Sequence, residues 1–545
     1  MALQVWLPLN GNTKNQGLAN ITTSASGLTT VDGKLGSGYR FDNGSQSGAG
    51  ISINSNLLDI LGSKNSIAVW IKPYGNHVHY NGTILSSGNW NGSCWAFGVS
   101  QDNTQVDLFG NSYNTYINCS VPVNTWTHLA CINDGTTAYL YKNGEYVGSS
   151  AVASISKSDA TNTYVGRETY AGGYFGFNGA IQDLRVYNHC LSAKEVKEIA
   201  KGLVLHYKMD DGCLKTTNNL VTGLTGGGQC TISNNTVTIS GSNSDTYFYL
   251  NTSAALTSGK TYKISCVGHF DNGKYYYFPI GGQTNTSPGQ LLVKNGYCSL
   301  VFTANSTIQN NDTRIIMDDT SRSPGAGTIT NIILEEINGI CDCSGFGYNG
   351  TITSTTAPIT DSDSPRYNSC LNFDTTGKYI LCPAINFSGM TSSYSFSWWG
   401  KTPSWDCGLM YWGFTDGNRL NYYSGYYWNT GDGGDNPFYS SGTTTISRPS
   451  VNAWHHYVVT GDGSYSRLYV DGSLYGTAKT NRNLTGTQIC IHGWDTSANY
   501  KNAGDKISDF RIYATTLSVT DIKDLYSTSA AVCDNGTVMA YSLEE

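Results

Sequence analysis

The sequence is poor in charge and has no basic run. Of its 545 residues only 13% are charged, and 32 Lys and Arg against 39 Asp and Glu give a formal charge of −7. Nucleic-acid binding relies on clustered Lys and Arg, so we expect no nucleic-acid partner. No apolar run approaches the ~20 residues that a bilayer span needs, so we expect no membrane span. The start, Met1–Asn10, lacks the basic residues and cleavage site of a signal peptide, which predicts synthesis in a cytoplasm.

Glutamate is also scarce, and this bears on catalysis. A retaining glycoside hydrolase needs two carboxylates about 5 Å apart, which on a strand means acids at i and i+2 or i+4. None of the eight Glu has such a spacing, and the closest acidic pairs, Asp361/Asp363 and Asp432/Asp435, fall in loops rich in Gly, Ser and Pro. No Ser-His-Asp order, phosphate loop or nucleotide fingerprint is present. The sequence therefore predicts a protein that is not an enzyme.

The cysteines give little evidence of a disulfide framework. There are 15, an odd number, and no Cys-x-x-Cys pair. Several, such as Cys131, Cys266 and Cys490, occupy apolar strand positions. We expect buried free thiols; a disulfide framework and a zinc site are the alternatives.

What the chain does contain is an internal duplication. The residues that recur in order are Trp126-x-His128, Asp134-Gly135 and Leu140-Tyr141-x-Asn143-Gly144, matched by Trp454-x-His456, Asp462-Gly463 and Leu468-Tyr469-x-Asp471-Gly472. We expect the matched Trp and His to belong to the scaffold, so truncation of either Trp to Ala should cost about 3–5 kcal/mol as lost core. Residues that differ between the copies are free to carry function.

Alternating apolar residues and turn pairs define the fold class. Period-2 runs such as Ile67/Val69/Ile71 are separated by Asp-Gly and Asn-Gly pairs, which is typical of antiparallel hairpins in an all-β sandwich. Two short helices are expected after Ser192 and Ser518, because each Ser is followed three residues later by an acid, the pattern of a capping box.

The second copy is interrupted. Residues 203–210 resemble residues 3–10, but about 130 more residues separate this strand from the rest of its copy than in the first copy. We therefore predict an inserted β-sandwich. The predicted boundaries are 1–200 for the first copy, 201–214 for the first strand of the second, 215–338 for the insert, 339–530 for the remainder and 531–545 for a C-terminal strand or tail.

The repeated motifs, together with Ile181-x-Asp183-Leu-Arg185-Val-Tyr187 and Ile507-x-Asp509-Phe-Arg511-Ile-Tyr513, resemble the laminin-G-like, concanavalin A-like jelly-roll family. The resemblance implies two jelly-roll sandwiches. The insert, through Leu256–Ser265 and Ile329–Glu336, is similar to carbohydrate-binding-module-type sandwiches of phage tail proteins. The start of the chain is similar to virion structural proteins of phages and prophages. Family members include lectins, adhesion modules and glycoside hydrolases; the hydrolase branch shows Glu-x-Asp-x-x-Glu, which this chain lacks.

Aromatic residues provide the best candidates for a binding surface. Sugars present a flat C–H face that an exposed ring covers, while Asp, Asn and backbone groups bind the hydroxyls. Aromatics are dense between 405 and 439 and sparser in the corresponding part of the first copy. The candidate glycan-binding residues are Trp405, Trp412, Tyr423, Tyr427, Trp428, Trp90 and Tyr113. Adjacent aromatics on a strand face opposite sides, so part of this set is expected to point inward.

Calcium is the cofactor that the resemblance suggests. Several relatives hold Ca²⁺ at the rim of the sandwich with Asp, Asn and backbone oxygens. The candidate ligands are Asp416, Asn418, Asp432 and Asp435. The alternative is that these residues only form turns, as Asp and Asn commonly do.

These observations favour a non-enzymatic adhesin or decoration protein of a virion that binds glycans of a host-cell surface or mucus through aromatic loops. It would be assembled in the bacterial cytoplasm with other virion proteins. The alternatives are a purely structural protein of a tail, baseplate or capsid, a carbohydrate-active enzyme, and a lectin of the bacterial cell surface. No heptad coiled coil is visible, and homo-oligomerisation is left open.

Overall fold

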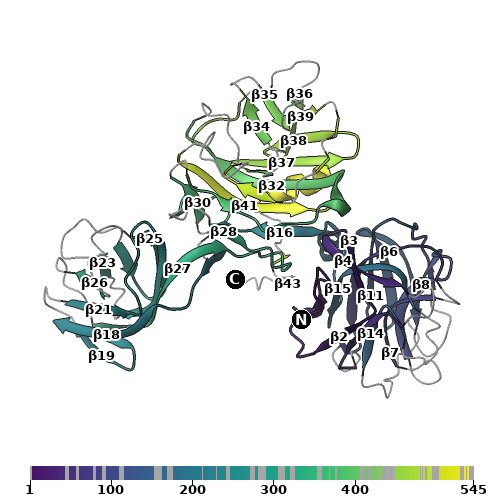
Figure 1. The fold of residues 1–545 in the computed structure, drawn as a ribbon, viewed down its shortest axis with the longest axis horizontal. Coiled ribbons are helices and arrows are strands. Elements are labelled where there is room, and N and C mark those ends of the chain that lie inside the picture. The colour runs from purple at the N-terminus through teal and green to yellow at the C-terminus, as the bar shows by residue number, and fades with distance from the viewer. Residues whose placement is uncertain are drawn as a thin grey trace.

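Strands build almost all of the molecule, in three lobes that differ in colour in Figure 1. The computed structural model describes residues 3–42, 48–56, 61–77, 81–88, 94–109, 116–151, 162–168, 176–210, 213–228, 230–240, 246–270, 276–279, 290–304, 314–319, 326–352, 359–367, 369–374, 377–404, 412–414, 420–423, 427–430, 438–439, 446, 448–478, 480–481, 483–484, 488–493, 503–527, 533–534 and 537–538.

The first lobe is a sandwich of two antiparallel sheets. One sheet has the order β13 (Glu145–Ala151), β12 (Thr137–Lys142), β11 (Thr127–Asn133), β6 (Asn65–Pro73), β15 (Asn178–Tyr187), β4 (Gly36–Asp42) and β3 (Thr29–Gly33), with β1 (Leu3–Leu7) also paired to β15. The other has the order β10 (Tyr116–Asn118), β9 (Gln105–Phe109), β8 (Cys94–Ser100), β7 (Asn81–Gly88), β14 (Thr163–Val165), β5 (Gly50–Ile53) and β2 (Thr23–Ser26).

Alternation along β6 divides its side chains between two cores. Ile67, Val69 and Ile71 belong to the core between the two sheets. Ala68 and Trp70 point the other way and belong to a second core. Both sets are buried, so both faces of β6 are covered.

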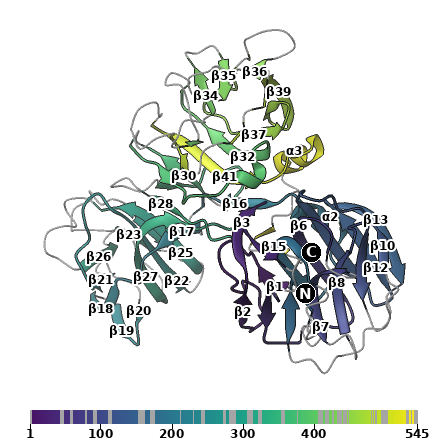
Figure 2. The ribbon, with the colours of Figure 1, turned by 45° about the vertical axis from the view of Figure 1, so that its right-hand side comes forward.

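The short helices α2 (Ala193–Ala200) and α3 (Val519–Tyr526) pack on the outer faces of the two sandwiches. The predicted capping boxes are confirmed: Ser192 and Glu195 begin α2, and Ser518 and Asp521 begin α3. Val196 and Ile199 of α2 join the core that contains Trp70, and Ile522 and Leu525 of α3 are likewise buried. The two helices lie at the junction of the two sandwiches in Figure 2.

The second sandwich repeats the first. One of its sheets has the order β29 (Ile359–Asp361), β30 (Cys370–Phe373), β41 (Asp505–Tyr513), β32 (Ser393–Lys401), β37 (His455–Asp462), β38 (Ser466–Val470), β39 (Ser473–Ala478) and β36 (Phe438–Tyr439). β16 (Leu203–Tyr207) pairs with β41 from Leu203/Tyr513 to Tyr207/Phe510. β1 pairs with β15 in the same way, starting at Leu3/Tyr187. The predicted partnership between residues 203–207 and the sheet built after residue 339 is therefore confirmed.

A single long strand, β27 (Gly327–Ile340), joins the third lobe to the second sandwich. Its first part pairs with β20 (Thr236–Ile239) and β22 (Thr261–Phe270), and its last residues pair with β17 (Leu214–Thr216) and β28 (Gly350–Ile352). Beyond β28 the sheet continues with β31 (Ile380–Leu381), β40 (Ile489–Ile491) and β33 (Trp412–Phe414), each paired with the strand before it. The lobe has its own buried cluster, which includes Phe248, Ile264 and Leu334.

The remaining strands of the third lobe form smaller pairings. β22 also pairs with β25 (Gly296–Thr303), and β19 (Cys230–Ser233) with β20. β18 (Val221–Gly228), β21 (Thr246–Thr252) and β26 (Arg314–Asp319) make one sheet, and β23 (Tyr276–Pro279) pairs with β24 (Gln290–Val293). Near the C-terminus, β42 (Cys533–Asp534) pairs with β43 (Thr537–Val538).

The two jelly-roll sandwiches share a continuous core. One cluster of buried side chains contains Trp70 and Val196 of the first sandwich together with Trp398 and Phe510 of the second. Side-chain hydrogen bonds cross the same boundary, from Asn10 Nδ2 to Phe346 O at 2.8 Å and from Asn386 Nδ2 to Asp32 Oδ1 at 2.7 Å.

The duplication extends to unusual backbone conformations. Asn143 and Asp471 both have φ of 51°, and Asp183 and Asp509 have φ of 54° and 55°. Few non-glycine residues adopt positive φ, and Asn and Asp do so more readily than most. The expectation about thiols is also confirmed for the described part of the chain, where the twelve cysteines are free and most are buried.

Candidate functional site

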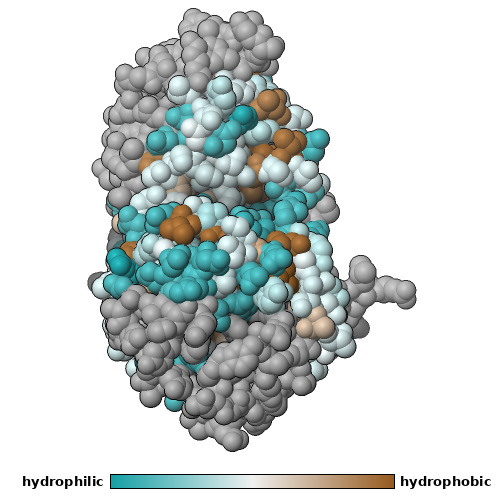
Figure 3. All heavy atoms as spheres, turned by 90° about the vertical axis from the view of Figure 1, so that its right-hand side faces the viewer, coloured by the Kyte–Doolittle hydropathy of each residue, from teal (hydrophilic) through white to brown (hydrophobic). Residues whose placement is uncertain are grey.

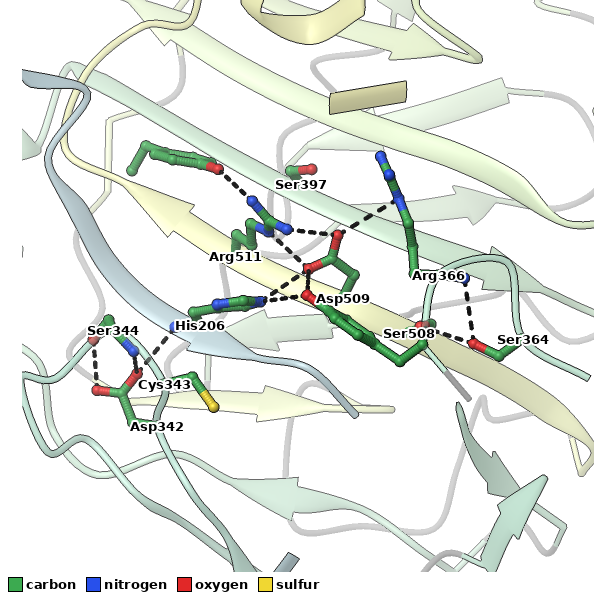
Figure 4. Close-up of polar contacts among 12 residues, drawn as sticks. His206, Asp342, Cys343, Ser344, Ser364, Arg366, Ser397, Ser508, Asp509 and Arg511 are labelled. Carbon is green, nitrogen blue, oxygen red and sulfur yellow. Dashed lines mark hydrogen bonds and ion pairs between the residues drawn. The ribbon is translucent and has the colours of Figure 1, made fainter. Parts of the chain in front are cut away.

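A buried ion-pair network lies on β41 of the second sandwich (Figure 4). Arg511 donates to both carboxylate oxygens of Asp509, at 2.7 and 3.0 Å, and His206 Nε2 lies 2.9 Å from Asp509 Oδ1. Burial works to raise the pKa of Asp509, but Arg511 and His206 outweigh it and hold that pKa far below its usual range. The carboxylate is therefore permanently charged and engaged on both oxygens.

The first sandwich holds the equivalent network with one telling difference. Arg185 Nε donates to Asp183 Oδ1 at 2.9 Å, and the partner at the position of His206 is Trp6, whose Nε1 donates to the same oxygen at 2.7 Å. The indole N–H of a tryptophan only donates a hydrogen bond, whereas a histidine ring can also gain or lose a proton. Because the position accepts either side chain, we interpret Asp183 and Asp509 as anchors that tie the first strand of each copy to its sheet.

An open cavity of about 430 Å³ lies where the first sandwich meets the second. Trp70 on β6, Trp126 just before β11 and Ala200 of α2 line it from the first sandwich. The second sandwich adds hydroxyl groups and one acid; these residues are Ser393, Thr515, Thr516, Ser518 and Asp521. Lys34, Asn143, Glu145, Lys197 and Lys201 complete the lining. Its volume falls in the range of small-molecule sites.

The surface around this junction is mixed. In Figure 3, which faces the first and second sandwiches from the side, the described surface is mostly teal and white, and brown residues form small separate patches. No wide apolar patch is visible among the described residues on this face, so a polar ligand suits it better than a large apolar partner.

The second copy explains why the cavity exists. α2 and α3 begin at equivalent serines, so Ala200 corresponds to Tyr526. A Cβ on Gly144 would lie 3.2 Å from Ala200 Cβ, and one on the equivalent Gly472 would lie 3.3 Å from Tyr526 Cδ1. The ring of Tyr526 stacks on Trp399 with centroids 5.7 Å apart. Trp399 is the equivalent of Trp70, so the first copy has Ala200 in place of this tyrosine ring, and Trp70 itself is 2% exposed.

The neighbouring histidines are part of the scaffold, as expected. His128 lies 5.3 Å from Trp70 between ring centroids, and His456 lies 5.2 Å from Trp399. Burial is the main cause that lowers the pKa of each to about 3. Both imidazoles are therefore neutral at physiological pH, and both are buried against a tryptophan ring.

The duplicated sandwich is shared with a known superfamily. Residues 43–197 and 374–523, together more than half of the chain, match the family model described as the concanavalin A-like lectin/glucanases superfamily. The chain belongs to this superfamily. No curated protein matches the sequence.

Solved structures of other proteins are similar to part of this chain at low identity. Domain 4 of AbnA, an extracellular arabinanase of Geobacillus stearothermophilus in complex with arabinotriose, is 19% identical over 36% of this chain and 98% of its own, with a TM-score of 0.30. The CBM40 of the Ruminococcus gnavus IT-sialidase bound to α2,3 sialyllactose is 17% identical over 33% and 98%, with a TM-score of 0.24. Arabinotriose and sialyllactose are ligands of those two proteins, and similarities of this size carry no argument about this chain.

The prediction that Trp412 covers a sugar is wrong. Trp412 lies on β33, which pairs with β40, and only 4% of its surface is exposed. Its ring stacks on Phe396 with centroids 4.1 Å apart and planes 10° apart. Side chains alternate between the two faces of a strand, and the Trp412 side chain points into the core of the second sandwich.

The other predicted glycan residues stay predictions. Tyr423 ends β34 (Leu420–Tyr423), and Tyr427 and Trp428 begin β35 (Tyr427–Thr430), which pairs with β34 as a hairpin. Only the backbone of these three residues is described. Trp405, Trp90 and Tyr113 lie outside the described residues.

The calcium prediction is also untested. Asp416, Asn418, Asp432 and Asp435 all lie outside the described residues. Within the described ranges no group of three or more His, Cys, Asp or Glu side chains is placed to hold a metal ion. Among the helices that can be described, none is long and apolar enough to cross a membrane.

Sequence reasoning missed the cavity because it assigned Trp126 to the core. Trp126 and its equivalent Trp454 are only partly buried, and Trp126 packs against the edge of the core, so the expectation that they are fully buried core residues is wrong. The sequence feature that could have indicated the cavity is the difference between Ala200 and Tyr526. These residues occupy equivalent positions in a segment that otherwise matches between the copies, and their side chains differ greatly in volume.

Proposed function

We propose that the protein binds carbohydrate without cleaving it, and that a sugar residue occupies the cavity beside Trp126. The observation that carries this proposal is the lining: a partly buried indole stands beside hydroxyl, amide and charged side chains in a cavity of about 430 Å³. Membership of the lectin/glucanases superfamily supports it at the level of fold.

The chemistry of the lining suits a sugar. Trp126 offers an apolar ring face for the C–H groups, and Trp70 also lines the cavity. Ser393, Ser518 and Asn143 provide groups that donate and accept hydrogen bonds with sugar hydroxyls. A small number of placed polar groups around an aromatic surface is the usual composition of a small-ligand site.

Asp107 and its neighbour Asp102 do not form a hydrolytic pair. Burial, with a smaller contribution from Asp102, raises the pKa of Asp107 to about 7, a value that would suit a general acid. Its acidic neighbour Asp102 accepts hydrogen bonds from Ser100 Oγ at 2.8 Å and Thr104 N at 3.1 Å and closes a turn. A glycosidase needs a second carboxylate that faces substrate, and Asp102 is engaged in its own turn.

A glycan array with the full chain tests the proposal. Wild-type protein should bind a defined set of glycans, and Trp126→Ala should lose that binding. Trp454→Ala is the matched control, because Trp454 is the equivalent residue, donates to Asp363 Oδ1 at 3.0 Å and does not line the cavity. Equal binding by Trp126→Ala and wild type would refute the site, and release of reducing sugar from a bound glycan would refute the non-enzymatic role.

We also retain the prediction that the protein acts on a virion, with a bacterial cell surface as the alternative location. Mass spectrometry of purified phage particles from the source strain should find the chain in stoichiometric amounts with tail or capsid proteins. Its presence only in a bacterial envelope fraction would contradict a virion role and leave the sugar-binding proposal standing.

A further inference from the structure

Lys34 is held firmly at the boundary of the two sandwiches. It lies in the turn between β3 and β4, and the next residue, Leu35, donates its backbone N–H to Gln182 Oε1 at 2.8 Å. Gly389 of the second sandwich packs so closely that a Cβ there would lie 2.8 Å from Lys34 Cα. The Lys34 side chain lines the cavity and is only 9% exposed.

The lysines of the cavity differ in their partners. Lys201 Nζ lies 2.5 Å from Glu198 Oε1 and 3.2 Å from Asp521 Oδ1, and Lys197 Nζ lies 3.9 Å from Glu145 Oε1. For Lys34 no carboxylate partner is found among the described residues, and its ammonium lies 5.7 Å from the centre of the Trp70 ring. Burial lowers the pKa of Lys34 to about 8. Within the described lining, the cavity therefore contains one buried cation whose desolvation no carboxylate offsets.

The second copy balances the equivalent charge. Arg366 lies over Trp399 at 5.4 Å from the ring centre, as Lys34 lies over Trp70. Arg366 Nε is 3.9 Å from the carboxylate of Asp509, and Tyr526 stacks on Trp399. The closed copy thus has a tyrosine stacked on its tryptophan and an acid within 4 Å of its cation. Among the described residues of the open copy, Ala200 replaces the tyrosine and no ion pair joins a carboxylate to Lys34. A ligand that supplies a ring and an anion would complete the first copy in the same way.

We propose that the cavity selects an acidic sugar residue, carboxylated or sulfated, whose anionic group pairs with the Lys34 ammonium while its ring lies against Trp126. This inference rests on the proposed function, because it assigns the ligand class of the same cavity. A charge-assisted hydrogen bond in a partly dry site contributes about 1.5–3 kcal/mol, which corresponds to a roughly ten- to hundredfold preference for the acidic sugar.

Calorimetric titration of the full chain with three matched oligosaccharides tests this inference: one neutral, one with a carboxylate and one with a sulfate ester. Wild type should bind one or both acidic ligands at least about tenfold more tightly than the neutral ligand. Lys34→Met should remove that preference and keep the neutral affinity. Lys72→Met is the control, because the Lys72 ammonium also lies over an aromatic ring, Tyr74 at 5.8 Å, but does not line the cavity.

A second variant keeps the test independent of folding defects. Ala200→Tyr places the residue of the closed copy in the open one, a side chain that the second sandwich already accommodates, and should abolish binding of all three ligands without lowering the melting temperature. Binding of neutral and acidic ligands with equal affinity, unchanged by Lys34→Met, would overturn the acidic preference and leave carbohydrate binding intact. Equal weakening for all three ligands in Lys34→Met would also overturn it. Absence of binding to every glycan tested in the array would instead overturn the proposed function.

Discussion

Gly345 of the second sandwich lies directly against the indole ring of Trp6 in the first. A Cβ on Gly345 would be 1.7 Å from Cη2 of that ring, and φ of Gly345 is +87°. Trp6 also donates to Asp183 in its own sandwich and meets Phe346 edge-to-face with centroids 6.1 Å apart. A close contact between the two sandwiches is therefore built on an anchor of the first.

Gly345→Ala should disrupt this junction. The added methyl overlaps Trp6 and also imposes an unfavourable positive φ, so we expect the variant to lose about 2–4 kcal/mol of unfolding free energy. Urea unfolding measures the loss. Gly347→Ala is the control, because Gly347 has φ of +78° but a Cβ there would meet no described atom within 4 Å, and it should lose only about 1 kcal/mol. Equal losses in the two variants would mean that the Trp6 contact is unimportant.

The buried anchors should be much more sensitive than surface ion pairs. Asp183→Asn or Asp509→Asn leaves an arginine buried without its carboxylate, which should cost about 3–5 kcal/mol in unfolding free energy. Asp462→Asn removes a carboxylate that pairs with Arg467 where about 29% of the side chain is exposed, and should cost less than about 1 kcal/mol. A loss at Asp183 or Asp509 no larger than that at Asp462 would contradict the anchoring role.

Acid should destabilise the protein through its buried histidines. The folded pKa of His128 is about 3, below the ~6.5 of an unfolded histidine. The folded state binds fewer protons, so this contribution is complete above pH 6.5 and is lost as pH falls from 6.5 toward 3. Between pH 6 and pH 5, His128→Leu should therefore lose about 1 kcal/mol less stability than wild type.

Urea unfolding of wild type and His128→Leu at pH 6 and at pH 5 measures this difference. The same two titrations with His269→Leu provide the comparison, because His269 is exposed in the third lobe. That variant should retain the pH dependence of wild type. An unchanged pH dependence in His128→Leu would show that the imidazole is not held neutral by burial.

Removing the tyrosine that closes the second copy should open a space over Trp399. Tyr526 stacks on both Trp399 and His456 but is 40% exposed, so Tyr526→Ala should cost about 1–2 kcal/mol, less than a fully buried aromatic. Tyr146→Ala, at a tyrosine that is 56% exposed, should cost less than about 1 kcal/mol. If both variants unfold at the same urea concentration, Tyr526 does not cover Trp399 in solution.

The duplication made much of the fold predictable from the sequence. The matched segments predicted which strands recur, and the similarity of residues 203–207 to 3–7 predicted the pairing of β16 with β41 across the insert. Capping boxes at Ser192 and Ser518 are local patterns, and local patterns can be recognised in a sequence. Asp183 and Asp509 were visible as matched residues, but their role as anchors depends on a bulge and on partners far away in the chain.

The cavity was not predictable in the same way. It is formed by residues from several separate segments, among them Lys34, Trp126 and Thr515, and no sequence pattern places these together. Trp412 was predicted to bind sugar because aromatic residues are dense around it in the sequence. That prediction failed because composition does not reveal which face of a strand is buried. Trp126 was assigned to the core for being matched, although a repeated residue need not be a fully buried one. Because Trp126 is only partly buried, truncation to Ala should cost less than the 3–5 kcal/mol expected of a core residue.

A crystal structure of the full chain with the tightest glycan from the array is the most direct test of the account. We predict a sugar ring in the cavity against Trp126, with an anionic group of that ring within hydrogen-bonding distance of Lys34 Nζ. Sugar bound instead on the aromatic loops between 405 and 439, with the cavity beside Ala200 unchanged, would contradict it.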